Sequence, residues 1–80
     1  MAARFTVFVR SGCHLCEEML QALAESRKKW DFQEDVVDIQ GDPLLEARYG
    51  TRVPVLTAGD EELCYYFLDQ SVLQQYFDKS

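Results

Sequence analysis

The sequence predicts one α/β domain, residues 1–80, whose elements follow the order β-α-β-α-β-β-α. Two observations indicate this class: short apolar runs alternate with amphipathic helical patterns, and a turn signal at residues 58–61 separates the last two runs. A long helical pattern between the first two runs requires a crossover connection, so those strands should be parallel. Parallel strands followed by a hairpin give a mixed four-stranded sheet with helices on both faces.

The first half of the chain contains the longest helical pattern. Residues 5–9 form an apolar run of β-branched and aromatic residues, which is typical of a buried strand. The helix is expected to begin at Cys13 and to end near Trp30, with the basic residues 27–29 in its last turn. Its core-facing positions recur at spacings of three and four: Leu15, Met19, Ala22, Leu23 and Ser26.

The middle of the chain predicts a strand and a short helix. Residues 32–39 are the second expected strand, with Val37 and Ile39 on one face and Val36 on the other, and Gln40-Gly41 ends it. Asp42 is the expected N-cap of the helix, and Pro43 is its expected first residue, where the missing N–H has no cost. Gly50 is the expected C-terminal stop.

The last third predicts a hairpin and a final helix. Residues 51–57 and 63–67 are the two expected strands, and Asp69 is the expected cap of the helix that follows. The expected buried face of this helix consists of Val72, Leu73, Tyr76 and Phe77. Residues 65–67, all aromatic, are expected to be sheet residues divided between core and surface. The alternative is an exposed aromatic patch that serves a protein partner.

Composition excludes several classes of partner. The net charge of −6 and the pI of about 4.5 argue against binding to nucleic acids or to anionic membranes. The sequence shows neither an apolar leader nor a run of ~20 apolar residues, so we expect a cytoplasmic protein. In that compartment, paired cysteines are more often catalytic or metal-binding than structural.

Cys13 and Cys16 form a C-x-x-C motif on the turn from a strand into a helix, which indicates thiol–disulfide chemistry. The unpaired N–H groups and the positive dipole end at a helix start favour a thiolate. Cys13, at the start of the helix, is the expected nucleophile. Cys16 lies one turn further on nearly the same face, where it can resolve a mixed disulfide formed on Cys13.

Charged neighbours are expected to tune these thiols. Arg10 and His14 would lower the pKa of a nearby thiol, whereas Glu17 and Glu18 would raise it, and the sequence leaves the net sign open. The alternative for His14 is a solvent-exposed residue with little effect.

The alternative chemistry for the cysteine pair is metal binding. Zinc takes four ligands, and only His14 and Cys64 remain beside the pair. His14 lies between the two cysteines and is badly placed to join them on one metal. An iron–sulfur cluster shared between two chains remains an alternative. Cys64 itself is expected to be a small buried core residue, and its alternative role is that of a third redox thiol.

Three features together resemble the glutaredoxin branch of the thioredoxin superfamily, over essentially the whole chain: the element order, the stretch Arg10-Ser11-Gly12-Cys13-x-x-Cys16, and Val53-Pro54 before a hairpin. The resemblance implies a thioredoxin-like, glutaredoxin-type three-layer sandwich. It implies that Pro54 is a cis-proline facing the active-site disulfide. It also implies a dithiol–disulfide oxidoreductase, in which the backbone of Val53 pairs with a bound thiol peptide.

The chain departs from classical glutaredoxins where these bind glutathione. They carry a Gly-Gly and then an acidic residue after the last strand, and this chain has aromatic residues 65–67 followed by Leu68 and Asp69. His14-Leu15 stands where they have Pro-Tyr. The better match is a small subfamily with a C-H-L-C motif and no Gly-Gly, in which Asp69 can stand in as the acidic cap.

The sequence therefore predicts a monomeric thiol–disulfide oxidoreductase that acts on a protein or small-molecule disulfide. Arg52, Val53, Pro54 and Asp69 are the expected substrate-binding residues. No resident cofactor or metal is expected. Glutathione or a thioredoxin-reductase system is the expected reductant. The alternative is a non-catalytic thioredoxin-fold module that binds a metal, a cluster or a protein.

Overall fold

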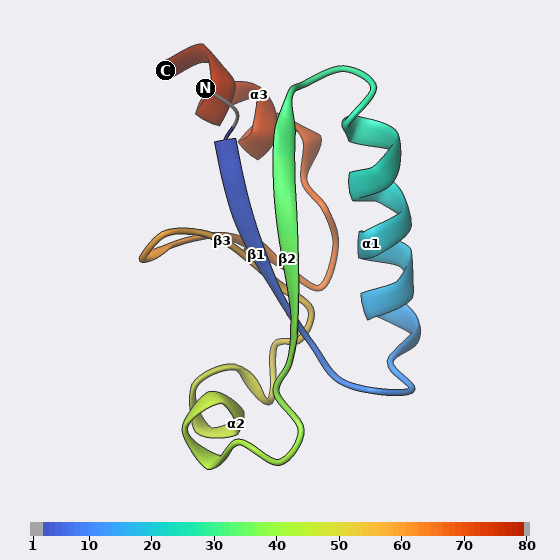
Figure 1. The fold of residues 1–80 in the computed structure, drawn as a ribbon, viewed down its shortest axis with the longest axis vertical. Coiled ribbons are helices and arrows are strands. Elements are labelled where there is room, and N and C mark those ends of the chain that lie inside the picture. Colours follow the sequence, from blue (N-terminus) through green and yellow to red (C-terminus); the bar gives the residue numbers. More distant parts are fainter. Residues whose placement is uncertain (1–2, 80) are drawn as a thin grey trace.

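The computed structural model describes residues 3–79, which form a four-stranded sheet and three helices (Figure 1). The predicted order of elements is confirmed. In chain order these are β1 (Ala3–Val9), α1 (His14–Ser26), β2 (Phe32–Asp38), α2 (Pro43–Tyr49), β3 (Val55–Ala58), β4 (Glu61–Tyr65) and α3 (Gln70–Lys79).

The sheet is mixed, as predicted, with strand order β2-β1-β3-β4. β1 and β2 are parallel, and Val7 lies opposite Val36. β3 is antiparallel to both β1 and β4, which places the hairpin on the far side of β1 from β2. β2 and β4 are consequently the two edge strands.

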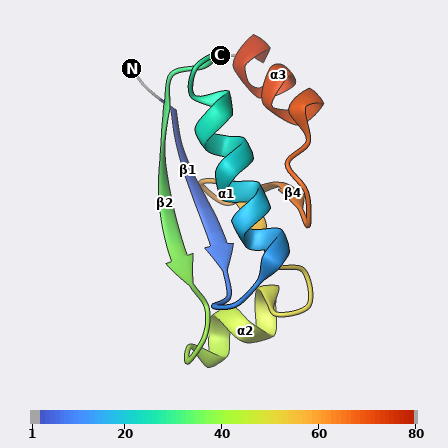
Figure 2. The same cartoon turned by 90° about the vertical axis from the view of Figure 1, so that its right-hand side faces the viewer.

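Helices cover both faces of the sheet and give three layers. Alternate residues of a strand point to opposite faces, so β1 supplies both cores. One core packs α1 and α3 on the sheet and consists of Phe5, Val7, Val9, Cys16, Met19, Leu23, Phe32, Leu56 and Leu73. The other packs α2 on the opposite face around Ile39, Tyr49 and Val55, with Phe8 against it. Figure 2 shows α1 and α3 together in front of the strands. No helix within residues 3–79 is both long enough and apolar enough to cross a membrane.

α1 ends earlier than predicted. Its last residue is Ser26, so the basic residues 27–29 lie beyond the helix and not in its last turn. The buried Ser26 hydroxyl donates to the Ala22 carbonyl oxygen at 2.9 Å, and the N–H of Trp30 donates to the Ser26 carbonyl oxygen at 3.0 Å. This turn brings Trp30 onto Phe77 of α3, with the two rings stacked 5.5 Å apart.

The hairpin strands also differ from their predicted ranges. The strand expected over residues 51–57 begins only at Val55, because Pro54 has no N–H to donate to a neighbouring strand. The strand expected over residues 63–67 spans Glu61–Tyr65. It stops there because Tyr66 has a left-handed backbone, with φ of 67°.

Candidate active site

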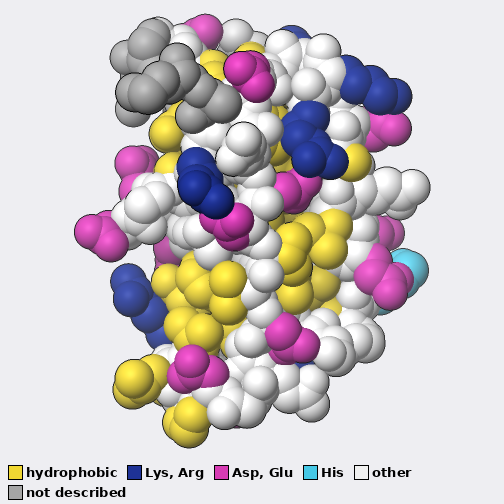
Figure 3. Space-filling view, in the orientation of Figure 1, with side chains coloured by type: hydrophobic (Ala, Val, Ile, Leu, Met, Phe, Trp, Pro, Cys, Tyr) yellow, Lys and Arg dark blue, Asp and Glu magenta, His cyan; other side chains and the backbone are white. Residues whose placement is uncertain are grey.

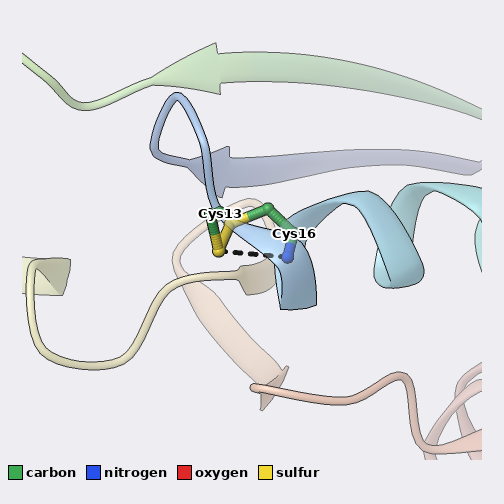
Figure 4. The surroundings of a disulfide bond; sticks show 2 residues. All are labelled: Cys13 and Cys16. Atoms are coloured by element: carbon green, nitrogen blue, oxygen red, sulfur yellow. Dashed lines mark hydrogen bonds between the residues drawn. A yellow bond between two sulfur atoms is a disulfide. The ribbon is translucent and has the colours of Figure 1, made fainter.

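Cys13 and Cys16 form a disulfide at the start of α1, with their Cα atoms 5.2 Å apart (Figure 4). Cys13 is the N-cap of the helix and is half-buried, whereas Cys16 lies in the first turn and is only 3% exposed. The N–H of Cys16 donates to the Cys13 sulfur at 3.1 Å. The more accessible sulfur is therefore the one that receives a hydrogen bond from the helix start.

The turn before Cys13 is fixed to the end of β2. Gly12 has a φ of 75°, which a residue without a side chain adopts easily, and the N–H of Cys13 donates to the Arg10 carbonyl oxygen at 3.3 Å. The Ser11 hydroxyl donates to the Asp38 carboxylate at 2.8 Å. The N–H of Gln40 and this hydroxyl hold the pKa of Asp38 below its ordinary value, so the carboxylate stays an acceptor for the turn.

The loop before β3 is the second part of the site. The Val53–Pro54 peptide bond is cis, which is the isomer that the family resemblance implies, and Pro54 is buried. Val53 packs against the same core cluster as Cys13. Figure 4 draws this loop, between α2 and β3, past the disulfide. The structure thus brings the C-x-x-C turn and the Val53–Pro54 loop to the same end of the domain.

The two residues expected to tune the thiols lie beside carboxylates. The Arg10 guanidinium is 2.8 Å from Glu46 of α2 and points to that helix. The His14 side chain is 82% exposed, and its Nε2 atom lies 3.6 Å from the Glu18 carboxylate. Their effect on the sulfurs stays a prediction.

Arg52, directly before Val53 and Pro54, has several partners within the protein. It forms an ion pair with Glu62 of β4, and it also donates to the Arg48 carbonyl oxygen at 2.8 Å. Its guanidinium lies 5.8 Å from the ring centroids of Tyr49 and Tyr65. The pKa of Arg52 is raised, chiefly by its hydrogen bond with Glu62. The sequence does not single out Glu62, because no local motif shows that this residue of β4 pairs with Arg52 in the loop before β3.

Asp69 caps α3, as predicted. Its carboxylate accepts from the N–H of Ser71 at 2.9 Å, and its carbonyl oxygen accepts from the N–H of Val72 at 3.1 Å. Cys64 lies close by on β4 and is half-buried, so the expectation of a fully buried residue is only partly right. Burial raises the pKa of the Cys64 thiol, and the backbone N–H of Asp69 acts against this.

The aromatic residues at the end of the last strand and directly after it lie outside the core. Tyr65, Tyr66 and Phe67 are 49%, 38% and 64% exposed, so the prediction that they are divided between core and surface is wrong. The cause is the end of β4 at Tyr65, which leaves the next two residues off the sheet. We call these three residues the aromatic rim. Tyr66 connects the rim to the loop, since its N–H donates to the Pro54 carbonyl oxygen at 2.9 Å.

The part of the chain that the structure describes holds no group of three or more His, Cys, Asp and Glu side chains placed to bind a metal ion.

Comparisons with known proteins identify this arrangement. A model of the glutaredoxin-like domain matches residues 4–78. The solution structure of Ne2328 from Nitrosomonas europaea is 45% identical, with a TM-score of 0.87 over 95% of this chain and 92% of that one. The crystal structure of XcR50 from X. campestris is 36% identical, with a TM-score of 0.71 over 95% of this chain and 97% of that one.

Two further similarities extend the comparison. The uncharacterized protein Rv0508 of Mycobacterium tuberculosis is 29% identical over 73 residues, which cover 85% of this chain and 75% of the relative. Thioredoxin 1 from Thermosipho africanus is 18% identical and has a TM-score of 0.63 over 94% of both chains. At that identity the likeness concerns the fold alone, and it confirms the predicted thioredoxin-like architecture.

Proposed function

The chain belongs to the glutaredoxin-like domain family, and from that premise we propose that it is a thiol–disulfide oxidoreductase that uses Cys13 and Cys16. The observation that carries this proposal is the hydrogen bond from the N–H of Cys16 to the Cys13 sulfur, 3.1 Å long, at the first turn of α1. A donor aimed at a sulfur stabilises its ionised form, and the thiolate is the form that attacks a disulfide. The half-buried position of Cys13 gives a substrate access to this sulfur.

The first step forms a mixed disulfide. In the reduced protein, the Cys13 thiolate attacks one sulfur of the substrate disulfide, and the new S–S bond forms as the substrate's own S–S bond breaks. The substrate's other sulfur leaves as a thiolate and takes a proton from solvent. Val53, next to the buried Pro54, is proposed to align an extended substrate segment through its backbone.

The second step releases the substrate. The Cys16 thiol loses its proton and attacks the Cys13 sulfur, and the substrate's second sulfur leaves as a thiolate that is then protonated. Two electrons have passed from the dithiol to the substrate, and the Cys13–Cys16 disulfide of the structure is the oxidised product. Because Cys16 is only 3% exposed, it meets the mixed disulfide from inside the protein and stays out of reach of bulky substrates.

An external thiol must then restore the dithiol. One equivalent of a dithiol, or two of a monothiol, reduces the Cys13–Cys16 disulfide by the same exchange in reverse. Glutathione and a thioredoxin-reductase system are the two candidate sources. A reducing cytoplasm, the location that the sequence favours, would supply either of them.

The proposal is tested by trapping the mixed disulfide. The reduced protein is mixed with bis(2-hydroxyethyl) disulfide, and the products are identified by mass spectrometry with peptide mapping. The wild-type chain should release two equivalents of 2-mercaptoethanol and close the Cys13–Cys16 disulfide. Cys16→Ser should stop after one equivalent, with the adduct on Cys13.

Cys13→Ser is the matched control, and it should release almost no 2-mercaptoethanol. The proposal fails if Cys16→Ser still releases both equivalents without an adduct, because Cys16 would then have no resolving role. It also fails if the wild-type dithiol does not react.

A further inference from the structure

The guanidinium of Arg52 is hydrogen-bonded by two groups of this chain. Glu62 takes one of its terminal nitrogens, and the Arg48 carbonyl oxygen takes the other at 2.8 Å. The rings of Tyr49 and Tyr65 lie 5.8 Å from the guanidinium carbon. The Glu62 carboxylate beside this cation offsets much of its attraction for an anionic ligand.

Arg52 matters because of its position in the chain. It immediately precedes Val53 and Pro54, and Val53 packs against the same core cluster as Cys13. Because Val53 is proposed to align the substrate, Arg52 is the cation that adjoins the aligned segment in the chain. Free, this arginine would attract a substrate carboxylate, whereas the Glu62 carboxylate paired with it offsets that attraction.

The other charges near the loop are mixed, and Arg48 of α2 is exposed with its guanidinium over the Tyr49 ring that Arg52 also faces. Arg10 is paired with Glu46 at 2.8 Å, and Glu17 adds a negative charge in the first turn of α1. His14 is exposed and lies beside Glu18. Figure 3 shows hydrophobic side chains gathered over the lower half of one face, toward the α2 end, and Lys and Arg side chains mainly toward the opposite end.

The surface next to Arg52 is apolar. The aromatic rim exposes Tyr65, Tyr66 and Phe67, and the Tyr66 hydroxyl donates to the Thr51 carbonyl oxygen at 2.7 Å. The rim therefore continues directly into the loop that carries Arg52. This surface offers aromatic groups together with the Arg52–Glu62 ion pair.

We propose that Glu62 sets the substrate specificity of the site: by neutralising Arg52, it disfavours anionic thiols such as glutathione and directs the dithiol to disulfides with uncharged or cationic surroundings. Glu62 acts through Arg52 and is a positioning residue. The inference rests on the proposed function and names the substrate class of the same site. Glutathione carries two carboxylates and one ammonium group, so it loses most when the cation beside Val53 is paired with a carboxylate.

Three small disulfides that differ in charge test the proposal. Glutathione disulfide is anionic, bis(2-hydroxyethyl) disulfide is neutral and cystamine is cationic. For each disulfide, the rate at which it oxidises the reduced protein is followed by alkylating the remaining thiols and measuring the masses of the products by mass spectrometry. The wild-type chain should react more slowly with glutathione disulfide than with either other probe.

Glu62→Gln should free Arg52 and raise the ratio of the glutathione disulfide rate to the neutral rate roughly three- to tenfold at low salt, as expected for one added unit of charge near the surface. Glu61→Gln is the matched control, since it removes the same charge from the neighbouring position of β4 and should leave this ratio near the wild-type value. In the double variant Arg52→Gln/Glu62→Gln the gain should disappear, because the cation that produces it is gone.

The inference is overturned if Glu62→Gln leaves the ratio unchanged, if Glu61→Gln raises it equally, or if the gain persists without Arg52. It is also overturned if the wild-type chain prefers glutathione disulfide. A wild-type dithiol that reacts with none of the three probes would instead refute the proposed function itself.

Discussion

The Tyr66 hydroxyl donates a 2.7 Å hydrogen bond to the backbone carbonyl oxygen of Thr51 and so ties the chain after β4 to the loop before Pro54. A second bond acts beside it, from the N–H of Tyr66 to the Pro54 carbonyl oxygen at 2.9 Å. Tyr66 makes both from a left-handed backbone, φ 67°, which costs an L-residue roughly 1–2 kcal/mol. The two hydrogen bonds offset that cost and hold the loop against the end of the hairpin.

Tyr66→Phe is expected to lower the free energy of unfolding by about 1 kcal/mol, because it removes one hydrogen bond and keeps the ring. Urea denaturation measures the change, and the slope of the transition should stay the same. Tyr65→Phe is the control, since its hydroxyl has no hydrogen-bond partner within residues 3–79. Equal losses in the two variants would show that the Thr51 contact contributes nothing.

Cys64 is expected to react slowly. Burial raises the pKa of its thiol, so less thiolate is present at neutral pH than for a free cysteine. With Cys13 and Cys16 oxidised, iodoacetamide at pH 8 should modify Cys64 several-fold more slowly in the folded protein than in urea. Because the folded-state pKa is the higher one, the contribution of Cys64 to stability is complete at neutral pH and is lost as the pH rises through that pKa.

Mass spectrometry of the alkylated protein gives the rate, and Cys64→Ala provides the baseline. Equal rates in the folded and unfolded protein would show an accessible thiolate. That result would favour the other role considered for Cys64, a third redox thiol.

Local chemistry explains which features the sequence predicts. The strand-to-helix turn at Cys13, the Asp42 cap and the helical crossover each depend on residues close together in the chain, so spacing alone reveals them. The family resemblance adds the relation between Pro54 and the cysteines, which are some 40 residues away. Together these predict the order of elements along the chain, the mixed sheet and the residues of the candidate site.

Tertiary contacts explain what the sequence does not predict. Arg52 and Glu62 are 10 residues apart and Arg10 and Glu46 are 36 apart, and no local pattern pairs them. The aromatic run at residues 65–67 is typical of a strand, but Tyr66 takes a backbone conformation that only its tertiary hydrogen bonds stabilise. Residues 27–29 suit a helix end, yet the buried Ser26 and the packing of Trp30 turn the chain earlier.

Glu34 is expected to destabilise the folded protein at neutral pH. Its side chain is only 11% exposed, its Oε2 atom lacks a hydrogen-bond partner, and the Arg27 guanidinium is 3.6 Å from Oε1. Burial raises the pKa of this carboxyl group, and Arg27 only partly opposes the effect. Because the folded-state pKa lies above the unfolded value, the contribution of Glu34 to stability is complete below the unfolded pKa and is lost as the pH rises through the folded one.

Glu34→Gln should therefore raise the Tm at pH 7 by roughly 2–4 °C, which corresponds to about half a kcal/mol for a domain of this size after allowance for solvent screening. Thermal unfolding by circular dichroism measures the shift, and the gain should shrink as the pH falls from the raised folded-state pKa of Glu34 to the ordinary value for glutamate, below which no gain should remain. Glu25→Gln is the control, because its exposed ion pair with Lys28 should matter little. An equal gain at acid and neutral pH would contradict the burial argument.

Asp42 caps α2, the helix that packs on the sheet through the core around Ile39, Tyr49 and Val55. Its carboxylate accepts from the N–H groups of Leu44 and Leu45 at 3.1 and 3.2 Å, which fixes the start of α2. The last residue of that helix, Tyr49, stacks on Phe8 of β1 with ring centroids 4.3 Å apart. Loss of the cap should therefore loosen the packing of α2 on the sheet as well as its first turn.

Asp42→Ala should lower the free energy of unfolding by about 1 kcal/mol, the usual contribution of an N-cap side chain. Asp42→Asn keeps the acceptor oxygen and should retain most of the stability, so the pair separates the hydrogen bonds from the charge at the helix start. Hydrogen exchange of the α2 amides should quicken in Asp42→Ala more than that of α1. If both variants lose the same stability, the charge and not the hydrogen bonds holds the helix start.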